Sequence, residues 1–264
     1  MLSHCVASYF GQVDYGMALE LQRRLVEQRK AGLISDRLLL LEHPHVITLG
    51  RRGSEDDILA PPAYLQEQGI AIYRVERGGL VTCHGPGQLM GYPIVDLRPW
   101  GGPADYVHAL EEVLIRAVAC FGVPGQRVPG HPGVWVEGDK LASIGVHVSG
   151  GVTSHGFALN VHPNLGLFSA IVACGIPGLR FTSLESLTGL TLPLEEVAQQ
   201  VARDFAAVFS MEVSWQPPEV LVITEGEGPT PVVITEGEGP TPEGLAAFPP
   251  VQPVSEALGV GSRL

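Results

Sequence analysis

Three apolar segments joined by two glycine-containing turns constrain the fold of this chain more than any other feature. The segments cover residues 133–137, 140–148 and 152–161, and each has the length and composition of a short strand. Gly138-Asp139 and Gly150-Gly151 join them, and such pairs favour tight two-residue hairpins because glycine reaches the positive φ values that these turns need. Two successive hairpins predict three neighbouring antiparallel strands.

The remaining pattern mixes helices with further strands. Helical spacing is present at residues 14–30, with Asp14 as the N-terminal cap, and again at 104–121 and 194–209. Strand-like runs lie at 5–13, 38–42, 46–49, 71–76 and 89–97, and Pro93 within the last run indicates an edge strand or a bulge. Strict β-α-β alternation is absent. We therefore expect an α+β (mixed α/β) fold with a mixed, mostly antiparallel sheet packed with helices.

The chain divides into a long globular part and a short tail. Residues 1–218 have the length and apolar periodicity of one large domain, which we expect to be the catalytic domain. In the tail, residues 219–264, the ten-residue segment 222–231 recurs letter for letter as 233–242. A repeat rich in Pro, Gly and Glu cannot bury a core, so we expect a disordered or loosely docked tail without chemistry.

Composition limits the compartment and the partners. The net charge of −12 disfavours binding to nucleic acid or to an anionic membrane. We expect neither a signal peptide nor a membrane span, because the N-terminus lacks a basic region before an apolar run and the chain has no uncharged apolar run of about 18 residues. The expected location is the cytoplasm.

The four cysteines are widely separated and form neither a CxxC motif nor a zinc-ligand pattern, so we expect thiols and no metal. Cys5 and Cys120 are interpreted as small core residues.

A glycine-rich stretch follows the strand predicted at 71–76. Residues 77–93 read RGGLVTCHGPGQLMGYP. Glycine permits tight turns and close backbone approach, so the stretch is either a hairpin or a loop shaped to hold a ligand against the sheet. Taken alone, the residues favour neither alternative.

Cys174 is the cysteine best placed for chemistry, because glycine and proline follow it in Cys174-Gly175-Ile176-Pro177-Gly178. A thiol is reactive as the thiolate, and a nearby cation lowers its pKa. His84, His155 or Lys140 could supply that charge or accept the proton. Lys140 is one of only two lysines beside fourteen arginines, and lysine can lose its proton where arginine cannot. The alternative is an ordinary exposed hairpin lysine.

Cys83 is a rival nucleophile beside His84. Adjacent residues on an extended backbone face opposite sides, so these two are not expected to share a pocket.

Several motifs in order closely resemble one enzyme family. They are RGGLVTCHGPGQLMGYP at 77–93, LEHP at 41–44, GVWVEGDKLASIG at 133–145, HGFALNV at 155–161, ACGIPG at 173–178 and TSL at 182–184. Together they resemble the octanoyltransferases of lipoate biosynthesis, the lipoyl(octanoyl) protein transferase B family. The similarity spans most of residues 1–210.

The resemblance implies the fold shared by biotin and lipoate protein ligases. It implies transfer of octanoyl from octanoyl-acyl carrier protein to a lysine on lipoyl domains, those of 2-oxoacid dehydrogenases and the glycine cleavage H protein. The acyl group would pass through a thioester on Cys174, with Lys140 lowering the thiol pKa, and no cofactor is needed. The implied substrate-binding residues are Arg77, Gly78, Gly79, Leu80, Val81, Thr82, Cys83, His84, Ser143, Ile144, Gly145, Gly156, Phe157 and Ala158. Cys83 stands where the family usually has an aromatic or apolar residue.

Two other functions remain as alternatives. One is an ATP-dependent lipoate or biotin ligase on the same fold, which needs an adenylate site and no nucleophilic cysteine. The other is a non-catalytic module that binds acyl carrier protein. An acidic carrier would dock on a basic surface, for which Arg23/Arg24 and Arg51/Arg52 are the candidates.

Overall fold

The computed structural model describes residues 3–218, so the proposed tail at 219–264 lies outside the described residues. The strands are β1 His4–Gln12, β2 Asp36–Glu42, β3 Val46–Leu49, β4 Ala71–Arg74, β5 Val81–His84, β6 Gln88–Ile94, β7 Gln126–Val128, β8 His131–Val136, β9 Asp139–Ser149, β10 Val152–Asn160 and β11 Glu212–Trp215. The α-helices are α1 Tyr15–Lys30, α2 Pro62–Glu67, α3 Pro103–Ala119, α4 Leu184–Thr188 and α5 Leu194–Phe209.

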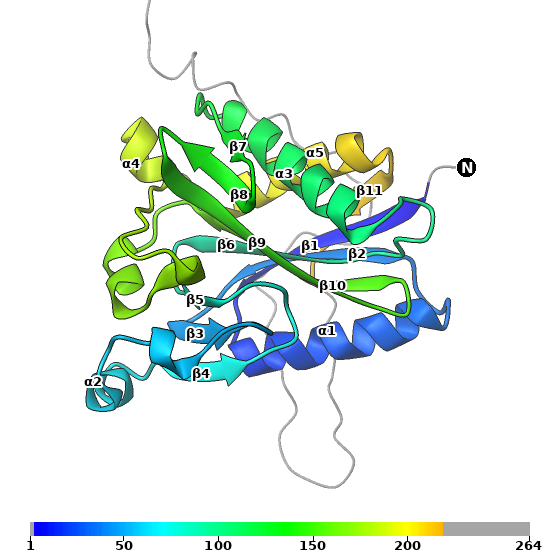
Figure 1. Ribbon diagram of the computed structural model, residues 1–264. Helices are drawn as coiled ribbons and strands as arrows, with labels where there is room; N and C mark the ends of the chain where they lie inside the picture. Colours follow the sequence, from blue (N-terminus) through cyan, green and yellow to red (C-terminus); the bar gives the residue numbers. More distant parts are fainter. Residues whose placement is uncertain (1–2, 219–264) are drawn as a thin grey trace, which may run out of the picture.

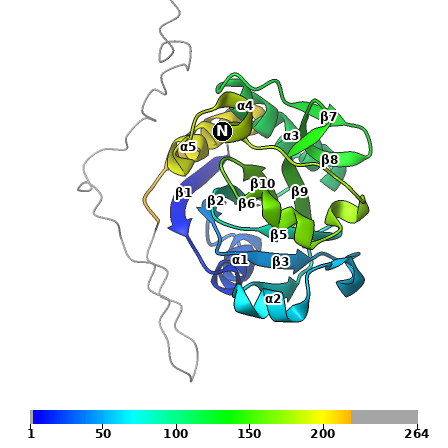
Figure 2. The same cartoon turned by 90° about the vertical axis from the view of Figure 1, so that its left-hand side faces the viewer.

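A large mixed sheet divides the molecule into layers (Figures 1 and 2). Its eight strands run in the order β11-β1-β2-β6-β10-β9-β8-β7, and only the β11–β1 and β1–β2 pairs are parallel. Helices α3 and α5 cover one face, whereas α1 and a three-stranded sheet, β4-β3-β5, lie on the other side. The expected mixed, mostly antiparallel sheet is confirmed, including the two hairpins that join β8, β9 and β10.

Two of the apolar clusters pack helices against the large sheet. The larger lies between the sheet and helices α3 and α5, and Leu110, Val201 and Phe205 are fully buried there. The smaller packs α1 against the opposite face through residues such as Leu21 and Leu25. Helix α1 starts as the sequence predicts, because the Asp14 carboxylate accepts a hydrogen bond from the Met17 amide at 3.1 Å.

Pro93 marks a gap in the pairing of two central strands. β6 is not an edge strand, since it lies between β2 and β10. However, its ladder with β10 stops at the Gly91–Phe157 pair and resumes only where the Thr153 amide donates to the Val95 carbonyl at 2.9 Å. Proline has no N–H to donate, so β6 and β10 do not pair at this point, where His155 adopts a φ of +55°. The Asp96–Val152 bridge keeps the register of the Gly91–Phe157 pair, so the structure has neither the expected edge strand nor the expected bulge here.

Two cysteine interpretations have different outcomes. Cys5 is fully buried on β1, as expected. Cys120 is exposed, because it lies just after the last residue of α3 and outside the buried stripe of that helix. Across residues 3–218, none of the helices combines the length and apolar character needed to cross a bilayer.

Candidate active site

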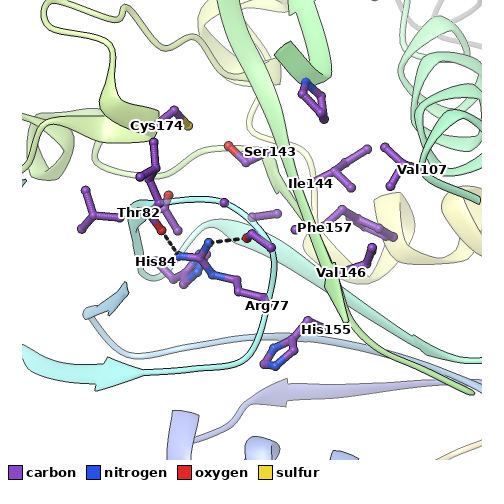
Figure 3. Close-up of a pocket in the computed structure, with 18 of the residues that line it drawn as sticks. Arg77, Thr82, His84, Val107, Ser143, Ile144, Val146, His155, Phe157 and Cys174 are labelled. Atoms are coloured by element: carbon purple, nitrogen blue, oxygen red, sulfur yellow. Dashed lines mark hydrogen bonds between the residues drawn. The ribbon is translucent and has the colours of Figure 1, made fainter. Parts of the chain in front are cut away.

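A cavity of about 290 Å³ lies where the 77–84 segment crosses β9 and β10 (Figure 3). Its lining contains Cys174, Lys140 and the residues expected to contact substrate in 77–84, 143–145 and 156–158, with the exception of Cys83. The Gly78 amide donates to the Val146 carbonyl at 2.9 Å, which fixes the glycine segment against β9. A Cβ on Gly145 would lie 2.9 Å from the Gly78 carbonyl oxygen, so glycine is needed at this crossing. The glycine-rich stretch that begins at Arg77 therefore forms a wall of the cavity rather than a simple hairpin.

Cys174 is held in an unusual backbone conformation at the edge of this cavity. Its φ of 55° and ψ of 17° lie in the left-handed region, which is uncommon for a residue with a side chain. Such strain costs on the order of 1–3 kcal/mol and persists only where the surroundings enforce it. The short 3₁₀ turn Ala173–Gly175 packs on β5 and presents the thiol to Lys140.

Lys140 is the amine next to the thiol. Its side-chain nitrogen lies 3.6 Å from the Cys174 sulfur, and the residue is only 4% exposed, so the ordinary exposed hairpin lysine is ruled out. The same nitrogen lies 4.9 Å from the centroid of the Trp135 ring, which covers it from the neighbouring strand. The buried Lys140 and the partly exposed Cys174 are thus close enough for proton exchange.

His84 and His155 were the other candidates to supply a positive charge to the Cys174 thiol or to accept its proton. His84 donates from Nδ1 to Gln88 Oε1 at 3.2 Å, and its Nε2 faces the Thr48 hydroxyl at 3.4 Å. Burial lowers the pKa of His84 well below its ordinary value and that of His155 to about 3, with the nearby Arg77 charge acting in the same direction. Both rings are therefore neutral at pH 7 and supply no positive charge to the thiol.

A hydrogen-bond chain connects His84 to the backbone of Lys140. Gln88 Nε2 donates to Asn160 Oδ1 at 2.9 Å, and Asn160 Nδ2 donates to the Thr182 carbonyl at 2.9 Å. The Thr182 amide in turn donates to the Lys140 carbonyl at 3.1 Å. These contacts link His84 to the segment that holds the backbone of Lys140.

Arg77 is a buried cation with which no carboxylate of residues 3–218 forms an ion pair. Its guanidinium donates to the Thr48 hydroxyl and carbonyl, and to the Gly78 and Leu80 carbonyls, at 2.8 to 3.2 Å. Burial lowers its pKa. The side chain thereby ties the glycine segment to β3, which shapes the cavity wall.

Cys83 does not line the cavity, in contrast to the implied assignment. It is 1% exposed and packs with Ile47 on the far side of β5, while the side chain of His84 faces the cavity. The alternation of side chains along a strand separates the two neighbours, as expected. Cys83 is consequently a core residue and not a second reactive thiol.

Sequence reasoning missed Trp135 and Tyr15. Trp135 pairs directly with Lys140 across the β8–β9 hairpin, so the hairpin register could have identified it. Tyr15 lines the cavity from the first turn of α1, and its sequence position gives no comparable signal. Within residues 3–218, three or more His, Cys, Asp or Glu side chains nowhere gather in a group that could hold a metal ion.

Comparison with known proteins gives consistent results. Residues 14–206 match the family model of the lipoyl protein ligase A/B catalytic domain. An octanoyltransferase of Acidobacterium capsulatum is 48% identical over 223 residues, covering 78% of this chain and 91% of that protein. One from Solibacter usitatus is 47% identical over 213 residues, covering 80% and 96%.

Solved structures share the fold. A lipoate-protein ligase A crystallised with ATP superposes with a TM-score of 0.64 at 13% identity, covering 83% of this chain and 90% of that one. A bipartite lipoate protein ligase from Thermoplasma acidophilum gives 0.63 at 13% identity, with 83% and 88% covered. At this identity the likeness concerns the fold alone, which is the expected lipoate ligase fold.

Proposed function

Because the chain belongs to the lipoyl protein ligase A/B catalytic-domain family, we propose that it transfers an octanoyl group to lipoyl-domain proteins through a thioester on Cys174. The chain is an acyltransferase, as are the octanoyltransferases that it resembles at 47–48% identity. The observation that carries the proposed mechanism is the 3.6 Å contact between Lys140 Nζ and Cys174 Sγ at a cavity of about 290 Å³.

The acylation half-reaction follows from this contact. Lys140 accepts the Cys174 proton, and the thiolate attacks the carbonyl carbon of the octanoyl donor thioester. A new C–S bond forms to Cys174, the donor's C–S bond breaks, and the donor leaves as a thiol with the proton that Lys140 returns. One thioester replaces another, so the step needs no separate activation of the acyl group.

The transfer half-reaction uses the same two residues. The acceptor lysine amine attacks the Cys174 thioester, an amide C–N bond forms, and the Cys174 sulfur leaves. Lys140 moves a proton from the incoming amine to the departing thiolate. Acceptors would be the lipoyl domains of 2-oxoacid dehydrogenases and the glycine cleavage H protein. We place the reaction in the cytoplasm, where a nucleophilic thiol stays reduced.

The donor would be octanoyl-acyl carrier protein, and Arg52 is the best candidate for its docking. Arg52 is exposed and lines the cavity, and no carboxylate in residues 3–218 pairs with it. Arg23 and Arg24 are bound to Glu20, and Arg51 to Glu76. Arg52→Glu should therefore raise KM for the carrier while Arg24→Glu does not, and an equal KM in both variants would refute docking at Arg52.

The decisive experiment is the intact mass of the protein after exposure to octanoyl carrier protein. One octanoyl adduct that hydroxylamine removes should form on the wild type and on Cys83→Ser, but not on Cys174→Ser. An unchanged adduct on Cys174→Ser would overturn the nucleophile assignment. Attachment of free octanoate that depends on ATP would instead revive the ligase alternative.

A further inference from the structure

The cavity has a reacting end and an inner end of different character. Figure 3 shows Cys174 and Ser143 on one side of Arg77 and His155 on the other. Val146, which pairs with His155, lies roughly 20 Å along β9 from Lys140 at about 3.3 Å per residue. An acyl chain attached to Cys174 would enter between these ends, along apolar lining from residues such as Leu80 and Ile144.

The inner end belongs to a buried cluster of aromatic and imidazole rings. The Tyr15 ring lies 4.9 Å from the His43 ring, and the Tyr92 ring lies 6.5 Å from that of His155. His43 donates to the Val13 carbonyl at 2.6 Å and accepts from the Tyr92 hydroxyl at 2.7 Å, so these two polar side chains are satisfied.

Two members of the cluster are not satisfied. Neither the Tyr15 hydroxyl nor the ring nitrogens of His155 make a hydrogen bond within residues 3–218. These atoms are not among the fully enclosed unpaired polar atoms of that range, which are His45 Nδ1 and the Tyr106 hydroxyl. Tyr15 and His155 are each only 4% exposed, and both line the cavity. Burial raises the pKa of Tyr15 to about 12 and lowers that of His155 to about 3, so both groups are neutral hydrogen-bonding groups at pH 7.

His155 lies opposite the gap in pairing at Pro93 and lines the cavity. It still pairs with Val146 of β9, adopts a φ of +55°, and donates its amide to Gln22 Oε1 on α1 at 2.8 Å. Gln22 is 2% exposed, so a buried side chain compensates for the missing partner on β6. The backbone is thus satisfied while the imidazole is left without a partner.

We propose that Tyr15 and His155 form a polar subsite at the inner end of the cavity, which binds a hydroxyl-sized group and limits the length of apolar acyl chains. With an octanoyl chain in place, the subsite holds water, since buried water requires polar partners. A longer alkyl chain displaces that water and leaves both side chains unpaired, which is unfavourable. A chain that ends in a hydroxyl replaces the water instead. This inference rests on the proposed acyl transfer.

A pair of donors of equal length tests the subsite in the unaltered protein. Carrier protein loaded with 8-hydroxyoctanoyl or with nonanoyl differs only in whether the chain ends in a hydroxyl or a methyl group. The subsite predicts kcat/KM about tenfold higher for the hydroxyl chain, equivalent to about 1.4 kcal/mol. An apolar inner end predicts the reverse order, and equal or reversed values would overturn the proposal.

Two variants then assign the effect to residues. Tyr15→Phe and His155→Phe each keep a ring and remove the polar atoms, so each should lower the octanoyl-to-decanoyl ratio of kcat/KM about tenfold. Tyr73→Phe is the matched control, because the Tyr73 ring lies 5.0 Å from that of Tyr15 but does not line the cavity. Its ratio should equal that of the wild type. An unchanged ratio in both cavity variants would also overturn the subsite.

The experiments distinguish a failure of the polar subsite from a failure of the proposed acyl transfer. If no donor of any length acylates the wild type, acyl transfer itself is wrong. If octanoyl acylates Cys174 and chain-length ratios do not respond to either substitution, only the polar subsite is wrong.

Discussion

The side-chain nitrogen of Lys140 lies 3.6 Å from the sulfur of Cys174, although the two residues are 34 positions apart in the chain. The segment that follows Cys174 pairs with the backbone of Lys140 and so brings the two residues together. The Lys140 amide donates to the Arg180 carbonyl at 3.0 Å, and the Thr182 amide donates back to Lys140 at 3.1 Å. The backbone around Lys140 is therefore fixed by the same segment that delivers the thiol.

Replacing Lys140 with arginine separates charge from proton transfer. Lys140→Arg keeps a cation near the sulfur but cannot accept its proton, since the guanidinium stays protonated. We expect the single-turnover acylation rate to fall about 10²-fold or more, as is typical when a general base is lost. Lys30→Arg is the control, because Lys30 binds Glu27 and Ser149 on the surface. Wild-type acylation by Lys140→Arg would contradict the base assignment.

The cysteines should differ in reactivity toward iodoacetamide in the native protein. Cys174 and Cys120 are accessible, whereas Cys5 and Cys83 are at most 1% exposed. Burial raises the pKa of the Cys5 and Cys83 thiols, which disfavours the reactive thiolate. Peptide mapping should show Cys174 labelled first, and prior octanoylation should protect that residue alone. Labelling of Cys83 at the rate of Cys174 would contradict its place in the core.

Much of the fold follows from local patterns. The hairpin turns near Gly138 and Gly150 fix the order of three strands, and the Asp14 cap fixes the start of α1. These features depend on neighbours in the chain, which is why sequence reasoning finds them. Neither option expected at Pro93, an edge strand or a bulge, is present, because the place of β6 in the sheet depends on strands distant in sequence.

The sequence indicated some residues of the candidate site and gave no signal for others. Motif resemblance indicated Cys174 and Lys140, and the geometry supports their pairing. It could not show that Cys83 packs away from the cavity while its neighbour His84 faces it, since that depends on which face of β5 is covered. Nor could it show that Tyr15 reaches the cavity, because α1 contacts the site only through tertiary packing.

Buried histidines should make the protein less stable in mild acid. Burial lowers the pKa of His43 to about 4 and that of His155 to about 3, from the ordinary 6.5. Below pH 6.5 the unfolded chain binds protons that the folded chain does not, so the free energy of unfolding falls as the pH falls. The slope is up to about 1.4 kcal/mol per pH unit for each histidine. Urea titrations at pH 7.5, 6.5 and 5.5 measure it.

A variant shows whether these histidines cause the slope. His43→Gln removes one titrating group, so its stability should depend less steeply on pH than that of the wild type, even if it is less stable at pH 7.5. Asp36 acts in the opposite direction at lower pH, because burial raises its pKa. The comparison is therefore confined to pH 5.5 and above. An identical slope in His43→Gln would contradict the assignment.

Gly133 should be required for the position of Lys140. Its φ is +132°, and a Cβ there would lie 2.2 Å from the Ala142 carbonyl oxygen and 3.0 Å from Lys140 Cε. In Gly133→Ala the backbone must move, and the lysine with it. Gly138→Ala, in the turn of the same hairpin, is the control, because its φ of +88° imposes backbone strain with nothing within 4 Å of the new Cβ.

We expect Gly138→Ala to lose about 1–2 kcal/mol of unfolding free energy with little change in acylation. Gly133→Ala should lose more and should also acylate about 10²-fold more slowly, since small misplacements of reacting groups have effects of that size. Urea unfolding and single-turnover acylation, measured on both variants, separate the two effects. If both variants lose equal stability and acylate equally fast, Gly133 does not position Lys140, which other contacts then hold in place.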